Sequence, residues 1–400
     1  MGLQLCQLCE IAYFVTDKIP LENVLLTDYV TTDSLLPNKE GRCVAQNLPP
    51  QKCALTHYKC GDVLVANIRP YLKKIWFADR EGGASADVLV FRAKSGHSQE
   101  FLYASLLQDT FYDYVMKGKK GSKMPRGDRD QIMRYSIPKL SLAEEACIGN
   151  MILSFCTKIN VSRRINDNLE AMAKQLYDYW FVQFDFPNEE GKPYKSSGGT
   201  MVWNEKLKRE IPQGWSNGVL SDVANITMGQ SPDGSSYNED GEGIIFYQGS
   251  TDFGLRFPDI RQYTTSPSRY ANKGDILMSV RAPVGALNIA NNDCCIGRGL
   301  SALSSKIGSM THLYYLMNDF RLKFEGMNSA GTTFGSITKD ELFSLPVIIP
   351  TKSVISEFEQ VCEPIFDKQM IIGEEINVLT KQRNELLPLL MNGQATVNSD

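Results

Sequence analysis

The fold is decided by the stretch FCTKINVSRRINDNLEAMAKQLYDYW, residues 155–180 of a 400-residue chain. Within it, steps of three and four residues pick out a series of mostly apolar side chains: Phe155, Ile159, Ser162, Asn166, Leu169, Ala173, Leu176 and Trp180. Such alternation is typical of a helix that packs lengthwise against another helix in a coiled coil. We therefore predict a single long helix from about Leu142 to Phe184.

The same register returns 210 residues later, in a second predicted helix. Its series is Ile365, Gln369, Ile372, Ile376, Leu379, Arg383, Leu386 and Leu390. Equal phasing at equivalent places in two half-chains favours antiparallel packing of the two helices against each other. Three members of the two series are polar, namely Asn166, Gln369 and Arg383. If buried they would fix the register, but the preferred interpretation places them at the edge of the seam.

Short motifs outside the helices also repeat between the two half-chains. The matching segments are 61–64 with 274–277, 86–91 with 299–303, 101–103 with 312–315, 121–123 with 331–333, and 135–138 with 347–350. In the first pair a Gly-Asp turn precedes an apolar run, which predicts a strand. The repeat predicts an α+β fold, in which two tandem domains mix strands with short helices and are related by an approximate two-fold axis.

The predicted order along the chain is domain, helix, domain, helix. The first domain spans 1–140, its long helix 141–184, a linker 185–214, the second domain 215–350, its long helix 351–393 and a tail 394–400. The linker is assigned from the turn and coil formers in 188–193 and 196–199.

Composition bears on location and on metal binding. No apolar run approaches the roughly 18 residues that a transmembrane helix needs, and Glu10 interrupts the apolar N-terminal stretch. Neither a membrane span nor a signal peptide is therefore predicted. The ten cysteines are scattered, and only Cys6 and Cys9 have C-x2-C spacing. This pattern predicts reduced cysteines in a cytoplasmic protein and no metal site.

No catalytic site is predicted either. Residues 118–123 are rich in glycine and lysine but lack the spacing of a P-loop. No predicted strand leads into a G-x-G-x-x-G turn, so no pocket for a dinucleotide or a methyl donor is evident. The three histidines, His57, His97 and His312, have neither metal-ligand nor triad spacing. We therefore expect no catalytic residue and no cofactor in this chain.

Positive charge is concentrated in segment 117–129, although the net charge of the chain is −4. Its six cations are Lys117, Lys119, Lys120, Lys123, Arg126 and Arg129, against the single acid Asp128. Clustered cations in a glycine-containing loop are typical of contact with nucleic-acid phosphates. The alternative is a merely solvated loop.

Loops of the second half contain side chains of the kinds that read base edges and phosphates. These residues are Gln230, Ser231, Tyr247, Gln248, Thr332, Thr333 and Ser336. Such residues hydrogen-bond to DNA, although any loop contains them. Arg69 and Arg281 stand at matching positions after the two Gly-Asp strands. They either contact DNA or make internal ion pairs.

Taken together, these features resemble the DNA specificity subunit of type I restriction–modification systems. The resemblance is strongest in 165–187, continues through 191–199 and 211–215, and returns in 331–337 and 386–393. It covers essentially the whole chain, and the first domain is the least family-like part. The resemblance implies two target-recognition domains, each of which reads one half of a bipartite, asymmetric site in double-stranded DNA.

The resemblance also implies a non-catalytic role among partner subunits. The long helices would form a spacer that docks two modification (methyltransferase) subunits, which restriction (translocase and nuclease) subunits then join. Those partners would use S-adenosylmethionine, ATP and magnesium. The expected spacer and docking residues are Asn166, Leu169, Leu176, Trp180, Ile372, Leu379 and Leu386. The alternative of another class is a coiled-coil adaptor whose two domains bind proteins or glycans.

Overall fold

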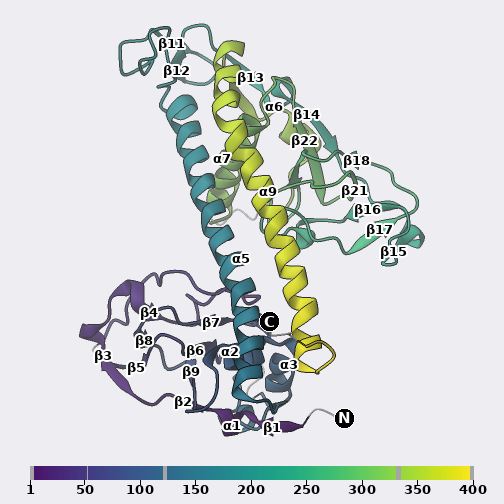
Figure 1. Ribbon diagram of the computed structural model, residues 1–400. Coiled ribbons are helices and arrows are strands. Elements are labelled where there is room, and N and C mark those ends of the chain that lie inside the picture. Colours follow the sequence, from purple (N-terminus) through teal and green to yellow (C-terminus); the bar gives the residue numbers. More distant parts are fainter. Residues whose placement is uncertain (1–3, 52, 120–123, 330–334, 397–400) are drawn as a thin grey trace. The chain divides into compact units, whose positions relative to one another are not determined.

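The computed structural model describes residues 4–51, 53–119, 124–329 and 335–396 and has a mixed α/β fold (Figure 1). The chain divides into two compact units. Unit 1 consists of Met1–Arg163 with Glu375–Asp400, and unit 2 of Arg164–Glu374. Because these boundaries cut both long helices, each unit contains a globular part and a length of each helix.

Unit 1 contains two four-stranded sheets with the orders β2-β9-β6-β7 and β3-β5-β8-β4, and a separate pair, β1-β10. The strands are β1 Leu5–Gln7, β2 Ala12–Phe14, β3 Lys18–Pro20, β4 Tyr29–Val30, β5 Ala54–Tyr58, β6 Val63–Ala66, β7 Ile75–Phe77, β8 Gly82–Ala84, β9 Val88–Ala93 and β10 Ser136–Pro138. The short helices are α1 Leu8–Ile11, α2 Gln99–Leu107, α3 Asp109–Lys117 and α4 Arg129–Ile132.

Unit 2 contains sheets with the orders β14-β22-β19-β20 and β15-β17-β16-β21-β18, and the pairs β13-β23 and β11-β12. The strands are β11 Met201–Asn204, β12 Arg209–Pro212, β13 Ser216–Val219, β14 Ala224–Met228, β15 Tyr237–Asn238, β16 Ile244–Tyr247, β17 Gln262–Thr264, β18 Tyr270–Ala271, β19 Ile276–Ser279, β20 Leu287–Ile289, β21 Cys294–Ile296, β22 Leu300–Ser305 and β23 Pro346–Ile349. The shorter helices are α6 Leu220–Val223, α7 Met310–Ser329 and α8 Lys339–Phe343.

The central strands of the two units are built alike. β2-β9-β6-β7 corresponds strand for strand to β14-β22-β19-β20, and β6 and β19 each follow a Gly-Asp turn. Because successive strand residues point to opposite faces, Val63 and Val65 enter one core, and Leu64 and Ala66 another. β19 alternates between two cores in the same way. Burial on both faces explains why each strand is a continuous apolar run.

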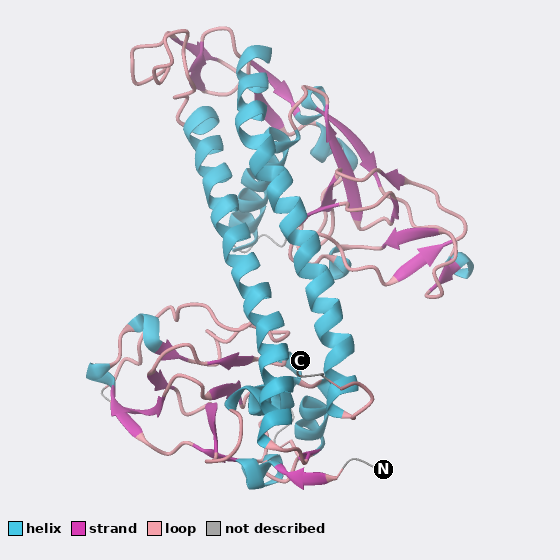
Figure 2. Cartoon of the chain, viewed as in Figure 1, coloured by secondary structure: helices cyan, strands magenta, loops and turns pink. Residues whose placement is uncertain are grey.

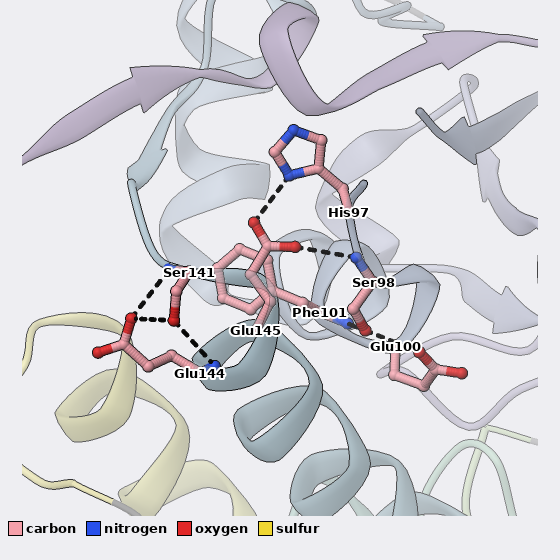
Figure 3. Close-up of polar contacts among 7 residues, drawn as sticks. All are labelled: His97, Ser98, Glu100, Phe101, Ser141, Glu144 and Glu145. Carbon is pink, nitrogen blue, oxygen red and sulfur yellow. Dashed lines mark hydrogen bonds and ion pairs between the residues drawn. The ribbon is translucent and has the colours of Figure 1, made fainter. Parts of the chain in front are cut away.

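α5 (Leu142–Tyr177) and α9 (Lys352–Met391) are the two longest helices of the described chain (Figure 2). α5 begins with a capping box, in which Ser141 N donates to Glu144 Oε2 at 2.8 Å and Glu144 N donates to Ser141 Oγ at 3.3 Å (Figure 3). The helix ends in a π-helical turn at Asp178–Val182.

Within unit 1, α5 and α9 run antiparallel. Ser162 Oγ donates to Glu375 Oε2 at 3.2 Å, and Arg383 Nη1 lies 3.9 Å from Cys156 Sγ. Later residues of α5 therefore meet earlier residues of α9.

Unit 2 shows the same direction of packing. Gln369 Nε2 donates to Glu170 Oε2 at 2.8 Å, and the rings of Tyr177 and Phe358 have centroids 6.5 Å apart. The order of contacts along α5 is again the reverse of the order along α9.

All sixteen residues of the two predicted series are buried or half-buried. The polar members are buried as well, with Asn166 7%, Gln369 1% and Arg383 5% exposed. Their preferred assignment to the edge of the seam is therefore wrong. A buried polar group needs partners, and Gln369 finds them in Glu170 and Arg256.

Residues 185–214 are more ordered than a linker of turn formers would be. They contain the β11-β12 hairpin. The ring of Phe186 also stacks between Tyr194 and Trp215, with centroid distances of 4.6 and 5.1 Å. Turn formers here build tight loops around a packed aromatic group, which composition alone does not reveal.

Candidate nucleic-acid interface

In unit 2, the loop after β14 meets the turn between β21 and β22. Gln230 N donates to Ile296 O at 3.0 Å, and Arg298 N donates to Ser231 Oγ at 3.3 Å. These contacts place Gln230 and Ser231 beside Arg298.

The turn itself is Gly297-Arg298-Gly299, and its glycines allow a close approach of the loop after β16. A Cβ at Gly297 would lie 3.0 Å from Gln248 O, and a Cβ at Gly299 only 2.7 Å from the same atom. Gly297 N also donates to Tyr247 O at 2.8 Å. The missing side chains therefore let Gln248 lie next to Arg298.

The end of β19 and the segment before α8 complete this group of loops. Val280 N donates to Gly299 O at 2.9 Å, so the next residue, Arg281, lies beside the glycine turn. An isolated antiparallel bridge pairs Arg281 with Ser336, and Ile337 N donates to Val280 O at 3.0 Å. Segments far apart in the sequence are thus joined by backbone hydrogen bonds.

We call six residues on these loops the unit 2 surface: Gln230, Ser231, Gln248, Arg281, Arg298 and Ser336. Ser231 and Gln248 are half-buried and the other four are exposed. Within the described ranges, neither Arg281 nor Arg298 forms an ion pair. Their guanidinium groups keep their donors free for phosphate oxygens or for O6 and N7 of guanine.

Two corrections concern this surface. Tyr247 was expected to contact DNA, but its side chain is fully buried in the core that contains Ile296 and Leu300. Burial also raises its pKa, which is typical of a core tyrosine. Arg298 was not predicted from the sequence. An arginine between two glycines, which is a pattern typical of a turn, is the signal that could have found it.

Unit 1 has a related arrangement after β6. Arg69 N donates to Pro125 O at 2.9 Å, and an antiparallel bridge pairs Ile68 with Arg126. Arg69 is exposed, has a left-handed φ of 53°, and forms no ion pair within the described residues. For both Arg69 and Arg281, the described residues thus supply no partner for the internal ion pair that was the alternative to DNA contact.

Arg126 does have a partner. Its Nη2 lies 3.1 Å from Asp87 Oδ1, and both side chains are largely exposed. An exposed pair of this kind contributes at most about 1 kcal/mol to stability. Arg126 can therefore leave Asp87 and bind a phosphate instead.

The three other described cations of segment 117–129 lie at or next to the ends of two short helices. Lys117 ends α3, Lys119 follows it, and Arg129 begins α4, and all three are exposed. Gln131 of α4 lies against Gly118, since a Cβ there would be 1.7 Å from its Oε1. Lys120 and Lys123 lie outside the described residues, as do Thr332 and Thr333 of unit 2. We call Arg69, Lys117, Lys119, Arg126 and Arg129 the unit 1 surface.

The expected docking residues of the long helices have a different role. Asn166, Trp180 and Ile372 are buried, and Leu169, Leu176, Leu379 and Leu386 are half-buried. Side chains that pack inside a unit are not available to a partner, so the docking part of this prediction is wrong for the buried members. The large apolar side chains that are exposed on α5, on its π-helical turn and on α9 are instead Leu142, Val161, Val378 and Leu389 in unit 1, and Ile165, Met172, Tyr179, Val182, Val361 and Ile371 in unit 2.

Within the described ranges, no helix is both long and apolar enough to cross a membrane. The same residues contain no group of three or more histidine, cysteine, aspartate or glutamate side chains that could hold a metal ion.

Comparison with known proteins identifies the family. A family model for the type I restriction modification DNA specificity domain matches residues 212–386. The putative type I restriction enzyme MjaX specificity subunit of Methanocaldococcus jannaschii is 30% identical over 304 residues, which are 75% of this chain and 68% of that protein. This chain belongs to the family of type I restriction enzyme specificity subunits. All six residues of the unit 2 surface lie inside the matched region, whereas the unit 1 surface precedes it.

Two further members of the family extend the comparison to nearly the full length. The type I restriction enzyme HindI specificity subunit of Haemophilus influenzae is 22% identical over 440 aligned positions, covering 92% of this chain and 94% of that protein. The crystal structure of a type I restriction–modification system S subunit from M. genitalium covers 100% of this chain and 97% of its own, with a TM-score of 0.60 and 12% identity. At that identity the likeness shows a shared fold.

Proposed function

We propose that this specificity subunit recognises DNA through the unit 1 surface and the unit 2 surface, and directs the modification and restriction subunits of its system to the sites it reads. The observation that carries the proposal is the gathering of exposed Arg281 and Arg298, which form no ion pair with a described residue, with Gln230, Gln248 and Ser336 on loops of unit 2. Arginine and glutamine make the bidentate contacts that distinguish guanine and adenine in the major groove.

We further propose that the target is bipartite and asymmetric, with one half-site for each target-recognition domain (1–140 and 215–350). The two surfaces support this through their chemistry. The unit 1 surface consists of arginine and lysine alone, whereas the unit 2 surface also contains glutamine and serine. Different side chains favour different bases, and phosphate contacts set only position.

The long helices would serve as an antiparallel coiled-coil spacer between two domains related by a pseudo-two-fold axis. The shared strand order and the antiparallel contacts within each unit support this arrangement. Two weak readers on a stiff spacer gain affinity through effective concentration, but only at DNA spacings that the spacer permits. The spacer would thus act as a ruler.

Two modification subunits would dock on the exposed apolar side chains of the helices, and restriction subunits would join them in the cytoplasm. Those partners would hold S-adenosylmethionine, ATP and magnesium, and this chain would supply no catalytic group. Adenine methylation inside a duplex requires base flipping, so catalytic subunits must be held close to each half-site. No observation on the described residues favours the adaptor alternative.

The test is DNA binding by the complex with its modification subunit, on duplexes that contain the site identified by sequencing methylated DNA from a host with the complete system. The double variant Arg281→Ala/Arg298→Ala should lose discrimination at the half-site read by unit 2, by about 1–3 kcal/mol for each base that is no longer read. Lys208→Ala, which removes a largely exposed cation of the β11-β12 hairpin, is the matched control. Equal binding of the unsubstituted complex to duplexes with and without the site would contradict the proposal.

The basic loop is tested separately. Replacing Lys119, Lys120 and Lys123 by alanine should weaken binding to all duplexes and flatten its salt dependence. The expected change is about 0.9 in the log–log slope for each phosphate that the loop no longer neutralises. A salt slope equal to that of the unsubstituted complex would show that this loop does not contact DNA.

A further inference from the structure

The loop at 248–259, here called the anchor loop, follows β16 in unit 2 and closes on itself. Phe253 and Pro258 form an isolated antiparallel bridge, and Gly254 N donates to Phe257 O at 3.1 Å. Arg256 is therefore held at the tip of a tight turn.

The tip is fixed between α5 and α9. Arg256 Nη1 lies 3.3 Å from Glu170 Oε2 on α5, and Nη2 donates to Gln369 Oε1 on α9 at 3.2 Å. Gln369 Nε2 donates to the same Glu170 oxygen at 2.8 Å, which closes a three-residue network. The rings of Tyr314 and Phe366 have centroids 5.5 and 5.0 Å from the guanidinium carbon.

Burial makes this contact specific. The Arg256 side chain is 6% exposed, and a buried cation is tolerated only where anions, acceptors and aromatic faces are correctly placed. A displaced tip would leave a desolvated charge without partners. The tip therefore has one favourable position on the helices.

The next residue adds a steric contact. Phe257 is 3% exposed and lies over Gly373 of α9, where a Cβ would come within 2.7 Å of Phe257 Cε2. Only glycine at this position of α9 lets the loop approach the helix so closely.

The other end of the anchor loop belongs to the unit 2 surface. The carboxylate of Asp252 accepts from Gln248 N at 2.8 Å and from Gly249 N at 3.4 Å, and Asp252 is 8% exposed. Asp259 N also donates to Asp252 O at 2.7 Å. One short, internally bonded loop thus carries a surface residue at one end and the helix contact at its tip.

We infer that Arg256, Glu170, Gln369 and Gly373 are positioning residues for DNA recognition. They touch no DNA themselves, but fix the orientation of the unit 2 surface on the helices and thereby set the half-site spacing that the subunit accepts. The inference rests on the proposed function. It explains why polar Gln369 stands in the middle of an apolar series, since it is the acceptor for the anchor loop.

The test measures binding of the complex with its modification subunit to three kinds of duplex. These carry the bipartite site at its natural spacing, the same site with one base pair added or removed, and the unit 2 half-site alone. The variants are Arg256→Met, which keeps an unbranched apolar stem but removes the charge, Arg256→Lys, and Gly373→Ala, which displaces Phe257 without altering charge. Arg209→Met is the control, because Arg209 also packs over a ring, that of Phe184, but belongs to β12 and not to the anchor loop.

We expect Arg256→Met and Gly373→Ala to reduce the preference for the natural spacing by about tenfold, since an orientation that is no longer fixed lowers the effective concentration of the second reader. Affinity for the half-site alone should change less than about threefold, Arg256→Lys should be intermediate, and Arg209→Met should resemble the unsubstituted complex.

Two results would overturn the inference. In the first, the spacing preference is unchanged in Arg256→Met and Gly373→Ala. In the second, half-site affinity falls as much as bipartite affinity, which would mean that these residues only maintain the fold of unit 2. If the unsubstituted complex shows no dependence on spacing, the ruler proposed for the spacer fails, and this inference fails with it.

Discussion

In unit 1 the globular part meets α5 near the start of that helix, and in unit 2 it meets α9 in a similar way. Glu145 of α5 is 1% exposed, and its carboxylate lies 2.8 Å from His97 Nδ1 and accepts from Ser98 N at 2.9 Å (Figure 3). In unit 2, Glu359 of α9 accepts from Ser309 Oγ and, at 3.2 Å, from Met310 N. Each carboxylate satisfies N–H groups at the beginning of a domain helix, α2 or α7.

The units differ in their second attachment to the helices. In unit 2 the buried Arg256 network holds the anchor loop. In unit 1, Arg163 of α5 lies 3.1 Å from Glu40, with side chains 19% and 34% exposed. A more exposed pair contributes less. The carboxylate contact to a domain helix accompanies the strand order that both units share. The loops differ between the units, and they determine how strongly each globular part is bound to the long helices at a second point.

The largest expected effect concerns the Gly-Asp turns. The buried carboxylate of Asp62 is 1% exposed and accepts hydrogen bonds from Arg92 Nε and Nη2, each at 2.7 Å. For its counterpart Asp275, burial raises the pKa of the carboxyl group above the usual value of 3.8. Asp62→Asn breaks a buried ion pair and should lower the free energy of unfolding by about 3–5 kcal/mol. Asp275→Asn should change it by less than about 1 kcal/mol. Urea unfolding at pH 7 measures both.

The raised pKa of Asp275 also predicts a dependence on pH. An acid whose pKa is higher in the folded state contributes stability below its unfolded pKa of about 4 and loses it as pH rises through the folded value. The Asp275→Asn variant lacks the titrating carboxyl group and should not show that loss. The free energy of unfolding of the variant, relative to that of the unsubstituted chain, should therefore increase as pH rises above about 4. Equal losses of stability for Asp62→Asn and Asp275→Asn at pH 7 would contradict the difference between the two turns.

The next effect concerns two helix glycines. A Cβ at Gly149 of α5 would lie 2.4 Å from Phe101 N, a backbone atom that cannot rotate away, whereas at Gly373 the nearest atom belongs to the Phe257 ring. Alanine improves helix propensity by about 1 kcal/mol at both positions. We therefore expect Gly149→Ala to destabilise the chain by about 3 kcal/mol and Gly373→Ala by about 1 kcal/mol. Thermal unfolding of both variants checks this, and a larger loss for Gly373→Ala would reverse the interpretation.

The smallest effect concerns the two buried arginines. Arg383 in unit 1 is 5% exposed and bonds to Asn384 Oδ1 and Cys156 Sγ, with no carboxylate partner among the described residues. Replacing an unpaired buried charge by an apolar side chain of similar length removes a desolvation penalty. Arg383→Met should raise the free energy of unfolding by about 1 kcal/mol, and with it the midpoint of thermal unfolding. Arg256→Met should lower that midpoint. A lower midpoint for Arg383→Met would show that Arg383 has an ionic role in unit 1.

Much of the helical part of this fold could be predicted, because helix periodicity is a local property. The 3-4 series in α5 and α9 selected only residues that are buried or half-buried, among them Ile159 and Leu390. The repeated Gly-Asp turns likewise preceded strands at the same place in two sheets of the same order, β6 and β19. An apolar run after a turn can be recognised from neighbouring residues alone.

What the sequence determined by itself is therefore the two long helices, the faces that they bury and the strands that follow the Gly-Asp turns. The tertiary structure decided which loops meet. Tyr247 looked like a residue for contacting DNA, but it is buried because a second set of strand residues covers it. Arg298 lies beside Gln230 through hydrogen bonds between segments about seventy residues apart, and Arg256 finds Glu170 and Gln369 at greater separations still. Such contacts depend on the packing of whole sheets and helices, whereas periodicity and turn signals extend over only a few residues.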